Sequence, residues 1–186
     1  MPETNLMKLD VRDRESGLVN AVVETPAGSR NKYRYDEKLG LFRLHKVLPR
    51  GARFPFDFGF IPGTRAADGD PIDLLIIADE SSVQGTLLTV RLIGALEAEQ
   101  TERKETIRND RLLGVPQGEK IRPSARSMKD LPKKMIEEIE HFFVAYNQAE
   151  GRRFVVLRRS GPVVAGKLVD QAVREYRSPE KNSAKG

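Results

Sequence analysis

The chain has 186 residues, of which 39% are hydrophobic and 32% charged, and its formal net charge is +5. It contains no cysteine and only two histidines, which excludes a disulfide framework, thiolate chemistry and a zinc site built from several histidines. No apolar run approaches the roughly 18 residues of a membrane span, and the polar N-terminus lacks a signal-peptide core. We therefore expect one cytoplasmic globular domain over residues 1–186, loosely ordered at 1–16 and 178–186.

Short strand-like runs dominate the first half of the chain, and turns rich in Gly, Pro, Asn and Asp separate them. This pattern predicts a small β-meander or barrel. The charged stretch 97–110 predicts a hairpin arm that returns through residues 111–115. The predicted strands cover residues 18–23, 32–35, 41–47, 56–61, 74–78 and 86–96.

A helix is predicted after the arm. Asp130 can cap it, Pro132 suits its first turn and Gly151 can end it. An apolar stripe supports this helix, because its members recur at four-, three- and four-residue steps. A strand over residues 154–157 and a helix over residues 162–176 follow. The stripe consists of Met135, Ile139, Phe142 and Tyr146.

Three carboxylates fall within six residues, at Asp68, Asp70 and Asp73, on a turn that leads into the apolar run 74–77. Like charges this close repel one another unless one is protonated or a cation joins them. Mg²⁺ prefers oxygen ligands and would relieve that repulsion. The alternative is a solvated polar turn, since Asp-Gly and Asp-Pro are common turn pairs. An EF-hand is excluded, because Ile72 and Asp73 stand where an acidic ligand and a glycine are required.

A second motif is misleading. The segment Gly161–Lys167 nearly matches a P-loop, but Leu168 follows where a metal-binding Ser or Thr is needed. No glycine-rich loop precedes it either. Gly161-Pro162 is more simply the start of the last helix.

The segment Asp68-Gly-Asp-Pro-Ile-Asp-Leu-Leu75 closely resembles the signature of the soluble family I inorganic pyrophosphatases. The resemblance extends from about residue 18 to residue 176, almost the whole chain. Further matching pieces, in order along the chain, are Glu24–Gly28, Lys32-Tyr33, Phe54–Thr64, Gly114–Pro116, and His141–Phe143 with Tyr146.

This resemblance implies an α+β fold in which a five-stranded closed, OB-like β-barrel is flanked by two α-helices. It implies Mg²⁺-dependent hydrolysis of pyrophosphate, or of another small phosphoanhydride, by a homo-oligomer that is a hexamer in many bacteria. Cations would neutralise the crowded oxygens of the anhydride so that water can attack. Neither a membrane nor a nucleic acid is an expected partner.

The resemblance also implies residue roles. Asp68, Asp70 and Asp73 would be metal ligands, and Asp70 would also be the general base beside the attacking water. Glu24 would face a further metal, while Lys32 and Tyr146 would hold phosphate oxygens. Taken alone, Glu24 could be a surface charge, Lys32 an ordinary strand residue and Tyr146 a packing residue.

Several positions depart from the family pattern. Gln100 and Asn109 align with an acidic pair of metal ligands, and Arg34 stands where the family has Glu. Lys46 replaces a phosphate-clamping Arg, and Arg111 replaces a Lys. The other substitutions are Asn147 for Lys, and Phe54 and Phe58 for Tyr. Glu99, Glu102, Glu105 or Asp110 could substitute for the acidic pair, although a one-residue slip along a strand reverses the side chain's face.

Two carboxylates are thereby lost and one is replaced by a cation, which weakens the field that attracts Mg²⁺. Our hypothesis is that Arg34, Lys46 and Arg111 neutralise part of the substrate charge, leaving one or two metal ions on the three aspartates. The activity would then be attenuated or directed to a different phosphoanhydride.

Two alternatives stay open. The first is a catalytically impaired relative that binds phosphate or a nucleotide in the same cleft. The second, less favoured, is an OB-type nucleic-acid-binding barrel. Such a barrel needs basic residues among exposed aromatic side chains. Arg43 and Lys46 near Phe42 meet this requirement only weakly, and aromatic residues make up 6% of the chain.

Overall fold

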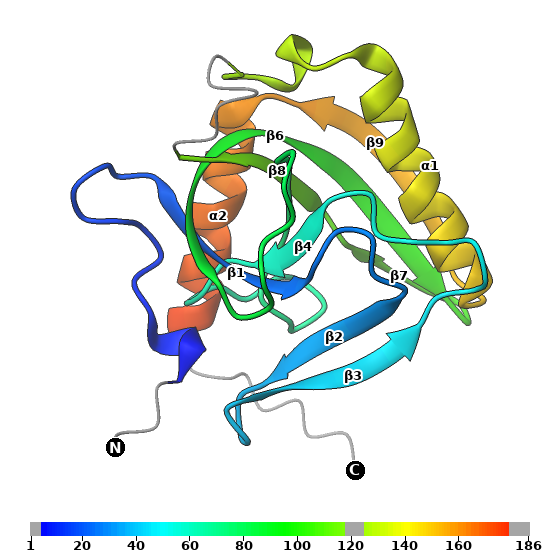
Figure 1. Cartoon of the computed structure of the whole chain (residues 1–186), viewed down its shortest axis with the longest axis horizontal. Helices are drawn as coiled ribbons and strands as arrows, with labels where there is room; N and C mark the ends of the chain where they lie inside the picture. The colour runs from blue at the N-terminus through cyan, green and yellow to red at the C-terminus, as the bar shows by residue number, and fades with distance from the viewer. Residues whose placement is uncertain (1–4, 118–124, 179–186) are drawn as a thin grey trace.

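The computed structural model describes residues 5–117 and 125–178 (Figure 1). A ring of five strands forms its centre, because β1 pairs antiparallel with both β4 and β6, β4 with β5, and β6 with β8. The parallel pair β5–β8 closes the ring. The five strands are β1 (Val19–Thr25), β4 (Asp57–Phe60), β5 (Asp73–Ile76), β6 (Leu87–Glu102) and β8 (Arg111–Pro116). Together with two helices, this ring confirms the predicted α+β fold.

The long strand β6 continues past the ring, six residues beyond the predicted end at residue 96. Its far half pairs with β7 (Glu105–Arg108) on one edge and with β9 (Arg153–Ser160) on the other. The predicted hairpin arm is thus the end of β6 together with β7. Glu97, the first residue of the charged stretch, is buried there, where it accepts hydrogen bonds from Arg158 and Ser160.

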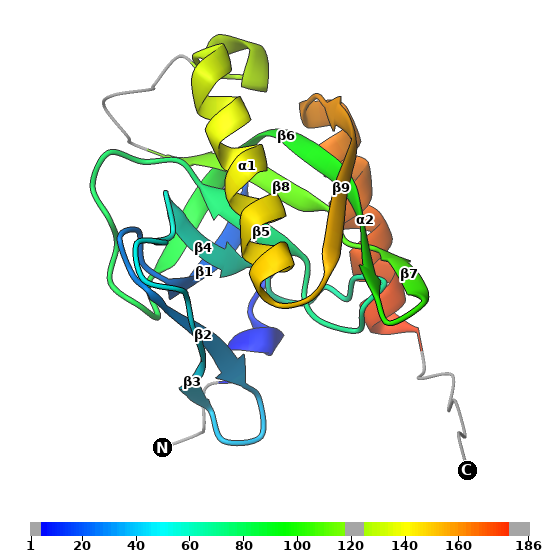
Figure 2. The ribbon, with the colours of Figure 1, turned by 90° about the vertical axis from the view of Figure 1, so that its right-hand side faces the viewer.

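The strands β2 (Asn31–Asp36) and β3 (Leu41–Val47) form a separate two-stranded hairpin. Figure 2 shows this hairpin below the ring, under the lower end of the first helix. It therefore supplies one wall of the space in which the site lies.

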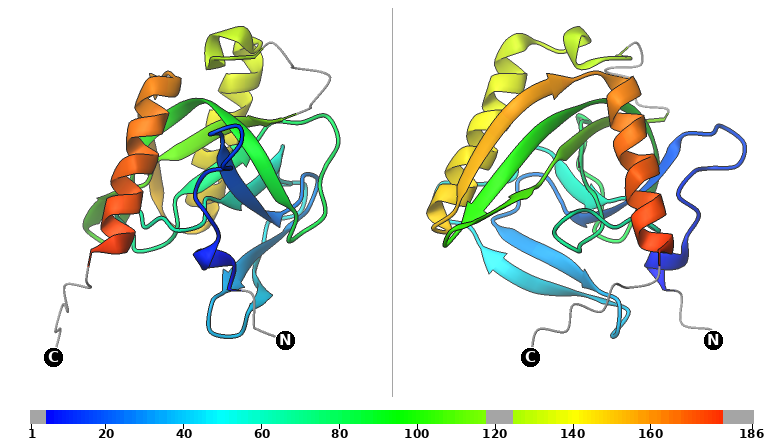
Figure 3. Two further views of the ribbon diagram at one scale, coloured as in Figure 1. Left: turned by 90° about the vertical axis from the view of Figure 1, so that its left-hand side faces the viewer. Right: turned by 180° about the vertical axis from the view of Figure 1, so that it is seen from behind.

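Helix α1 (Lys133–Ala149) and helix α2 (Pro162–Arg177) stand apart, with strands between them (Figure 3). Ile139 and Phe143 of α1 join the core cluster that contains Phe58. Small and branched side chains of α2 pack against a second cluster on the other strand faces. The most buried face of α1 comprises Ile136, Ile139, Phe143 and Asn147, so that Met135, Phe142 and Tyr146 of the predicted stripe lie at its edge.

The predicted cap of this helix was wrong. Asp130 ends a separate 3-10 helix (Met128–Asp130) and forms a capping box with Ser127, while α1 begins after Pro132 without a side-chain cap. The predicted end is right, because Gly151 follows the helix with a φ of 72°, which favours glycine.

The beginning of the chain is more ordered than the sequence predicts. Within residues 5–16 a 3-10 helix (Leu6–Lys8) buries Met7, and Arg12 forms a β-bridge with Val19. At the other end, Ser178 caps α2, and residues 179–186 of the predicted tail lie outside the described residues. In the two described ranges no helix is both long and apolar enough to cross a bilayer.

Candidate active site

A cleft of about 1220 Å³ lies between the β2–β3 hairpin, the 64–73 loop, the β6–β7 arm and the C-terminal ends of both helices. Every residue that the sequence assigned to the site lines this cleft, from six separate parts of the chain. These residues are Glu24, Lys32, Arg34, Lys46, Asp68, Asp70, Asp73, Arg111 and Tyr146.

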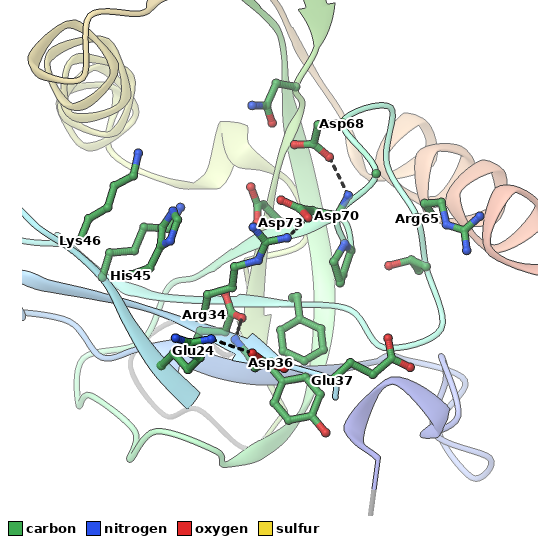
Figure 4. A pocket seen from close by; sticks show the side chains of 18 of the residues that line it. Glu24, Arg34, Asp36, Glu37, His45, Lys46, Arg65, Asp68, Asp70 and Asp73 are labelled. Carbon is green, nitrogen blue, oxygen red and sulfur yellow. Dashed lines mark hydrogen bonds and ion pairs between the residues drawn. The ribbon is translucent and has the colours of Figure 1, made fainter. Parts of the chain in front are cut away.

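Local hydrogen bonds shape the aspartate loop. The Asp68 carboxylate accepts from the backbone N–H of Asp70 (3.1 Å), and Gly69 between them has a φ of 87° that favours glycine. The hydroxyl of Thr64 accepts from the backbone N–H of Ile72 (3.1 Å). The turn therefore directs Asp68, Asp70 and Asp73 toward the same space, as Figure 4 shows.

Arginines already pair with two of the three aspartates. Arg34, on β2, forms an ion pair with Asp70, and Arg111, at the start of β8, forms one with Asp73. Across the described ranges, no group of three Asp, Glu or His side chains is close enough to hold a metal ion as the side chains stand. The carboxylates share one cleft, but a metal would have to draw them together.

The inner wall of the cleft is neutral. Gln100 and Asn109 are buried, and the Asn109 amide donates to the Gln100 side chain (2.9 Å) and accepts from Arg111. The alignment of these two residues with cleft positions is therefore supported by where they lie. Asp110 faces elsewhere: its carboxylate accepts from the backbone N–H of Ala98 (2.9 Å) and from Arg108 (2.8 Å).

The remaining acids of the arm do not rebuild this wall. Glu99 and Glu105 are absent from the described lining of the main cleft. Glu102 does line it, but its carboxylate lies 3.0 Å from the Arg152 guanidinium in an ion pair. No acidic side chain of the described part thus takes the place of Gln100 and Asn109 beside Arg111.

Aromatic rings hold two of the cations. The Lys32 ammonium lies 5.2 Å from the centre of the Phe58 ring and 5.5 Å from that of Tyr146. The Arg111 guanidinium lies 5.4 Å from the Phe143 ring centre. Such cation–π contacts stabilise a positive charge without neutralising it, and Arg111 also forms its ion pair with Asp73.

An ion pair also connects β3 with the end of α1 on the other side of the cleft. Lys46, on β3, forms an ion pair with Glu150, at the end of α1. Asn147 faces inward and donates to the backbone carbonyl of Phe143 (2.8 Å). His45 lines the cleft too, and the pKa of its imidazole is lowered by burial and by the nearby Lys32. Sequence reasoning missed Glu150 and His45, because nothing local to either residue signals that the hairpin folds toward α1.

Two carboxylates of the cleft hold protons unusually tightly. Burial raises the pKa of Glu24 to about 7, and the charge of Asp73 adds to the effect, although the Tyr35 N–H (2.7 Å) opposes it. Burial also raises the pKa of Asp68 to about 6, with contributions from Asp73 and Asp70. Asp68 is nevertheless an exposed residue, so solvent screens this effect and weakens it.

These groups fit a hard divalent cation. The donors are carboxylate oxygens, which Mg²⁺ prefers. Asp70 and Asp73 have arginine partners, whereas burial raises the pKa of Glu24 and Asp68. The donor set therefore has the chemistry of a site for a hard divalent cation.

The raised pKa of Glu24 predicts an unusual pH dependence of stability. The folded protein keeps the proton up to pH of about 7, whereas the unfolded chain releases it near 4.5. Stability of the metal-free protein should therefore fall as pH rises through this window, by about 3 kcal/mol at most at 1.36 kcal/mol per pKa unit.

Glu24→Gln tests this expectation, because the amide oxygen can still accept from Tyr35 N–H. Urea unfolding in a chelating buffer, at one protein concentration, should show the variant to be more stable than the wild type at pH 8 and similar at pH 5. An equal pH slope for both proteins would contradict the assignment.

Carboxylates facing cationic side chains, beside a ring of five strands, form a cleft suited to a cation together with a small phosphorylated anion. Residues 21–177 match the inorganic pyrophosphatase family. The inorganic pyrophosphatase of Geobacillus stearothermophilus is 35% identical over 162 residues, covering 87% of this chain and 96% of that protein. The crystal structure of the Thermus thermophilus inorganic pyrophosphatase has 33% identity and a TM-score of 0.84, covering 94% of this chain and 99% of the other.

An inorganic pyrophosphatase from Neisseria gonorrhoeae, 28% identical, aligns over 92% of this chain and 98% of its own with a TM-score of 0.83. The similarity therefore covers nearly the whole length of each protein. The chain belongs to the inorganic pyrophosphatase family.

Proposed function

We propose that this protein hydrolyses inorganic pyrophosphate to two phosphates with the help of Mg²⁺. One observation supports this most: Asp68, Asp70 and Asp73 share a single cleft with Lys32 and Arg111 in a member of this family. The cleft thus offers both carboxylates for a cation and fixed positive charge for an anion.

Each residue has a definite task in this proposal. Asp68, Asp70, Asp73 and Glu24 would hold Mg²⁺, which when bound neutralises phosphate oxygens and makes water more acidic. Asp70 would take the proton as water attacks one phosphorus and the bond from that phosphorus to the bridging oxygen breaks. Phosphate oxygens would be held by Lys32, Arg34, Lys46, Arg111 and Tyr146, all of which line the cleft.

The cleft's own cations also determine how much metal the reaction needs. Arg111 is buried and is held by Asp73 and Asn109, so its guanidinium stays in the cleft whether or not Mg²⁺ is present. We propose that one or two Mg²⁺ ions suffice. Arg34, Lys46 and Arg111 would supply the remaining neutralisation.

The test is phosphate release from pyrophosphate by purified protein, with Mg²⁺ and with a chelator, beside tripolyphosphate, ADP and ATP as competing substrates. We expect Mg²⁺-dependent release with pyrophosphate preferred, and a Mg²⁺ dependence that one or two ions describe. Preference for another phosphoanhydride would correct the substrate. A requirement for three or more ions would overturn the reduced metal count.

We further propose a cytoplasmic homo-oligomer, a hexamer by resemblance. Large apolar side chains exposed on the described surface, among them Val144, Leu157 and Val163, support an assembly that covers them. The mass of the protein in solution tests this: a monomer at micromolar concentration would contradict it.

A further inference from the structure

The ion pair between Arg34 and Asp70 conflicts with the task proposed for Asp70. Dashed lines in Figure 4 include this contact, in which the Arg34 guanidinium reaches from the hairpin to the carboxylate on the loop. The guanidinium contacts one carboxylate oxygen of Asp70, and its positive charge opposes a cation beside it. Arg34 therefore competes with Mg²⁺ for this carboxylate.

The two arginine–aspartate pairs of the cleft differ in how firmly they are held. The side chains of Arg111 and Asp73 are 7% and 20% exposed, and Asn109 and the Phe143 ring fix the guanidinium. The side chains of Arg34 and Asp70 are 51% and 42% exposed. Exposed ion pairs are weak and readily exchanged for another partner, so Arg34 is the arginine that can leave its aspartate.

A phosphate group offers Arg34 a better partner than Asp70 does. Guanidinium binds phosphate oxygens through two parallel hydrogen bonds, and a phosphoanhydride holds more negative charge than one carboxylate. Lys46 and His45 lie on the neighbouring strand and face the same space (Figure 4). A phosphate bound beside Lys46 and His45 would therefore lie in the same part of the cleft as the Arg34 side chain.

We propose that Arg34 covers Asp70 in the free protein and moves to the substrate when a phosphate group enters. Mg²⁺ then binds Asp70 more tightly when an anion is present. Because such coupling is reciprocal, Mg²⁺ also favours substrate binding by the same factor. This inference rests on the proposed function, since it takes Asp70 as a Mg²⁺ ligand and general base.

Calorimetric titration of the substrate-free full chain with Mg²⁺ tests the proposal. Removing the guanidinium in Arg34→Met uncovers Asp70 and removes a repelling charge, so Mg²⁺ should bind roughly threefold to tenfold more tightly than to the wild type. Arg43→Met is the matched control, because Arg43 lies opposite Arg34 in the hairpin and pairs with Asp36 instead. It should leave the Mg²⁺ affinity unchanged.

A second titration uses inorganic phosphate as the anion. Phosphate should strengthen Mg²⁺ binding to the wild type by a larger factor than to Arg34→Met. In the enzyme assay the same variant should need less Mg²⁺ for half-maximal activity yet have a higher KM for pyrophosphate. A purely structural role for Arg34 would not move these two quantities in opposite directions.

Equal or weaker Mg²⁺ binding by Arg34→Met would overturn the proposal. Its failure is separable from that of the proposed function, because calorimetry requires no turnover. An active enzyme whose Mg²⁺ affinity is unaffected by Arg34→Met would refute the role of Arg34 alone. If the protein is inactive but Arg34→Met binds Mg²⁺ more tightly than the wild type, the proposed hydrolase activity is refuted, whereas the covering of Asp70 by Arg34 is supported.

Discussion

Asp70→Asn is expected to lower kcat for pyrophosphate hydrolysis by about 10²–10⁴-fold, the usual contribution of a general base. Asparagine has the size of aspartate but cannot accept a proton. The main chain of residue 70 makes the hydrogen bonds that shape the loop, to Asp68 and to Ala66, and these survive the substitution. The loss should therefore be chemical rather than structural.

The measurement is phosphate release at saturating pyrophosphate and Mg²⁺, with variant and wild type purified in the same way. Asp36→Asn is the control, since Asp36 lines the outer cleft and pairs with Arg43, and its kcat should change less than about twofold, as for other surface substitutions. If Asp70→Asn kept the wild-type kcat, the general base would have to be another carboxylate. Equal background rates for Asp70→Asn and wild type would instead favour a phosphate-binding relative.

Arg111→Met should impair both activity and stability. Removing this guanidinium deletes a cation held 5.4 Å from the Phe143 ring and leaves Asp73 without its partner. Breaking a buried ion pair by removing one member costs about 3 kcal/mol. Losing one preorganised group that stabilises developing charge costs about 10²–10³-fold in rate, so we expect kcat/KM to fall by that order.

Urea unfolding in a chelating buffer and kcat/KM measured with Mg²⁺ separate the two effects. Arg111→Lys keeps the charge but not the planar fork, so it should recover part of the activity. Arg43→Met should change the free energy of unfolding by less than about 0.5 kcal/mol. If Arg111→Met lost stability but kept kcat/KM, then Arg111 would be structural and would not touch the substrate.

The aspartate triplet could be found from the sequence because its geometry is local. Gly69 and the run after Asp73 determine a turn and a buried strand within ten residues. The family resemblance aligned Gln100 and Asn109 with two metal-ligand positions and left Asp110 as an alternative. Gln100 and Asn109 line the cleft, whereas the Asp110 carboxylate accepts from Ala98 and Arg108 instead. Local sequence thus predicted the three aspartates, whereas the other six site residues depended on the comparison with the family pattern.

The prediction that Asp130 caps the long helix α1 was wrong, because a local signal does not identify which helical segment it caps. Asp130 is a good cap by residue type, and it does cap a helical turn, but the turn is a short 3-10 helix before α1. Two helical segments within a few residues leave the same sequence signal, and only packing shows where the longer helix begins.

By itself the sequence determined the fold class, the family resemblance and the nine assigned residues that line the cleft, because periodicity and motif order are properties of the chain. Only the tertiary structure decided which charged side chains form ion pairs with one another. Arg34 pairs with Asp70 and Lys46 with Glu150 across 36 and 104 residues. Charges are attracted to any opposite charge within reach, so sequence alone cannot select these partners; the position of the β2–β3 hairpin over the cleft does.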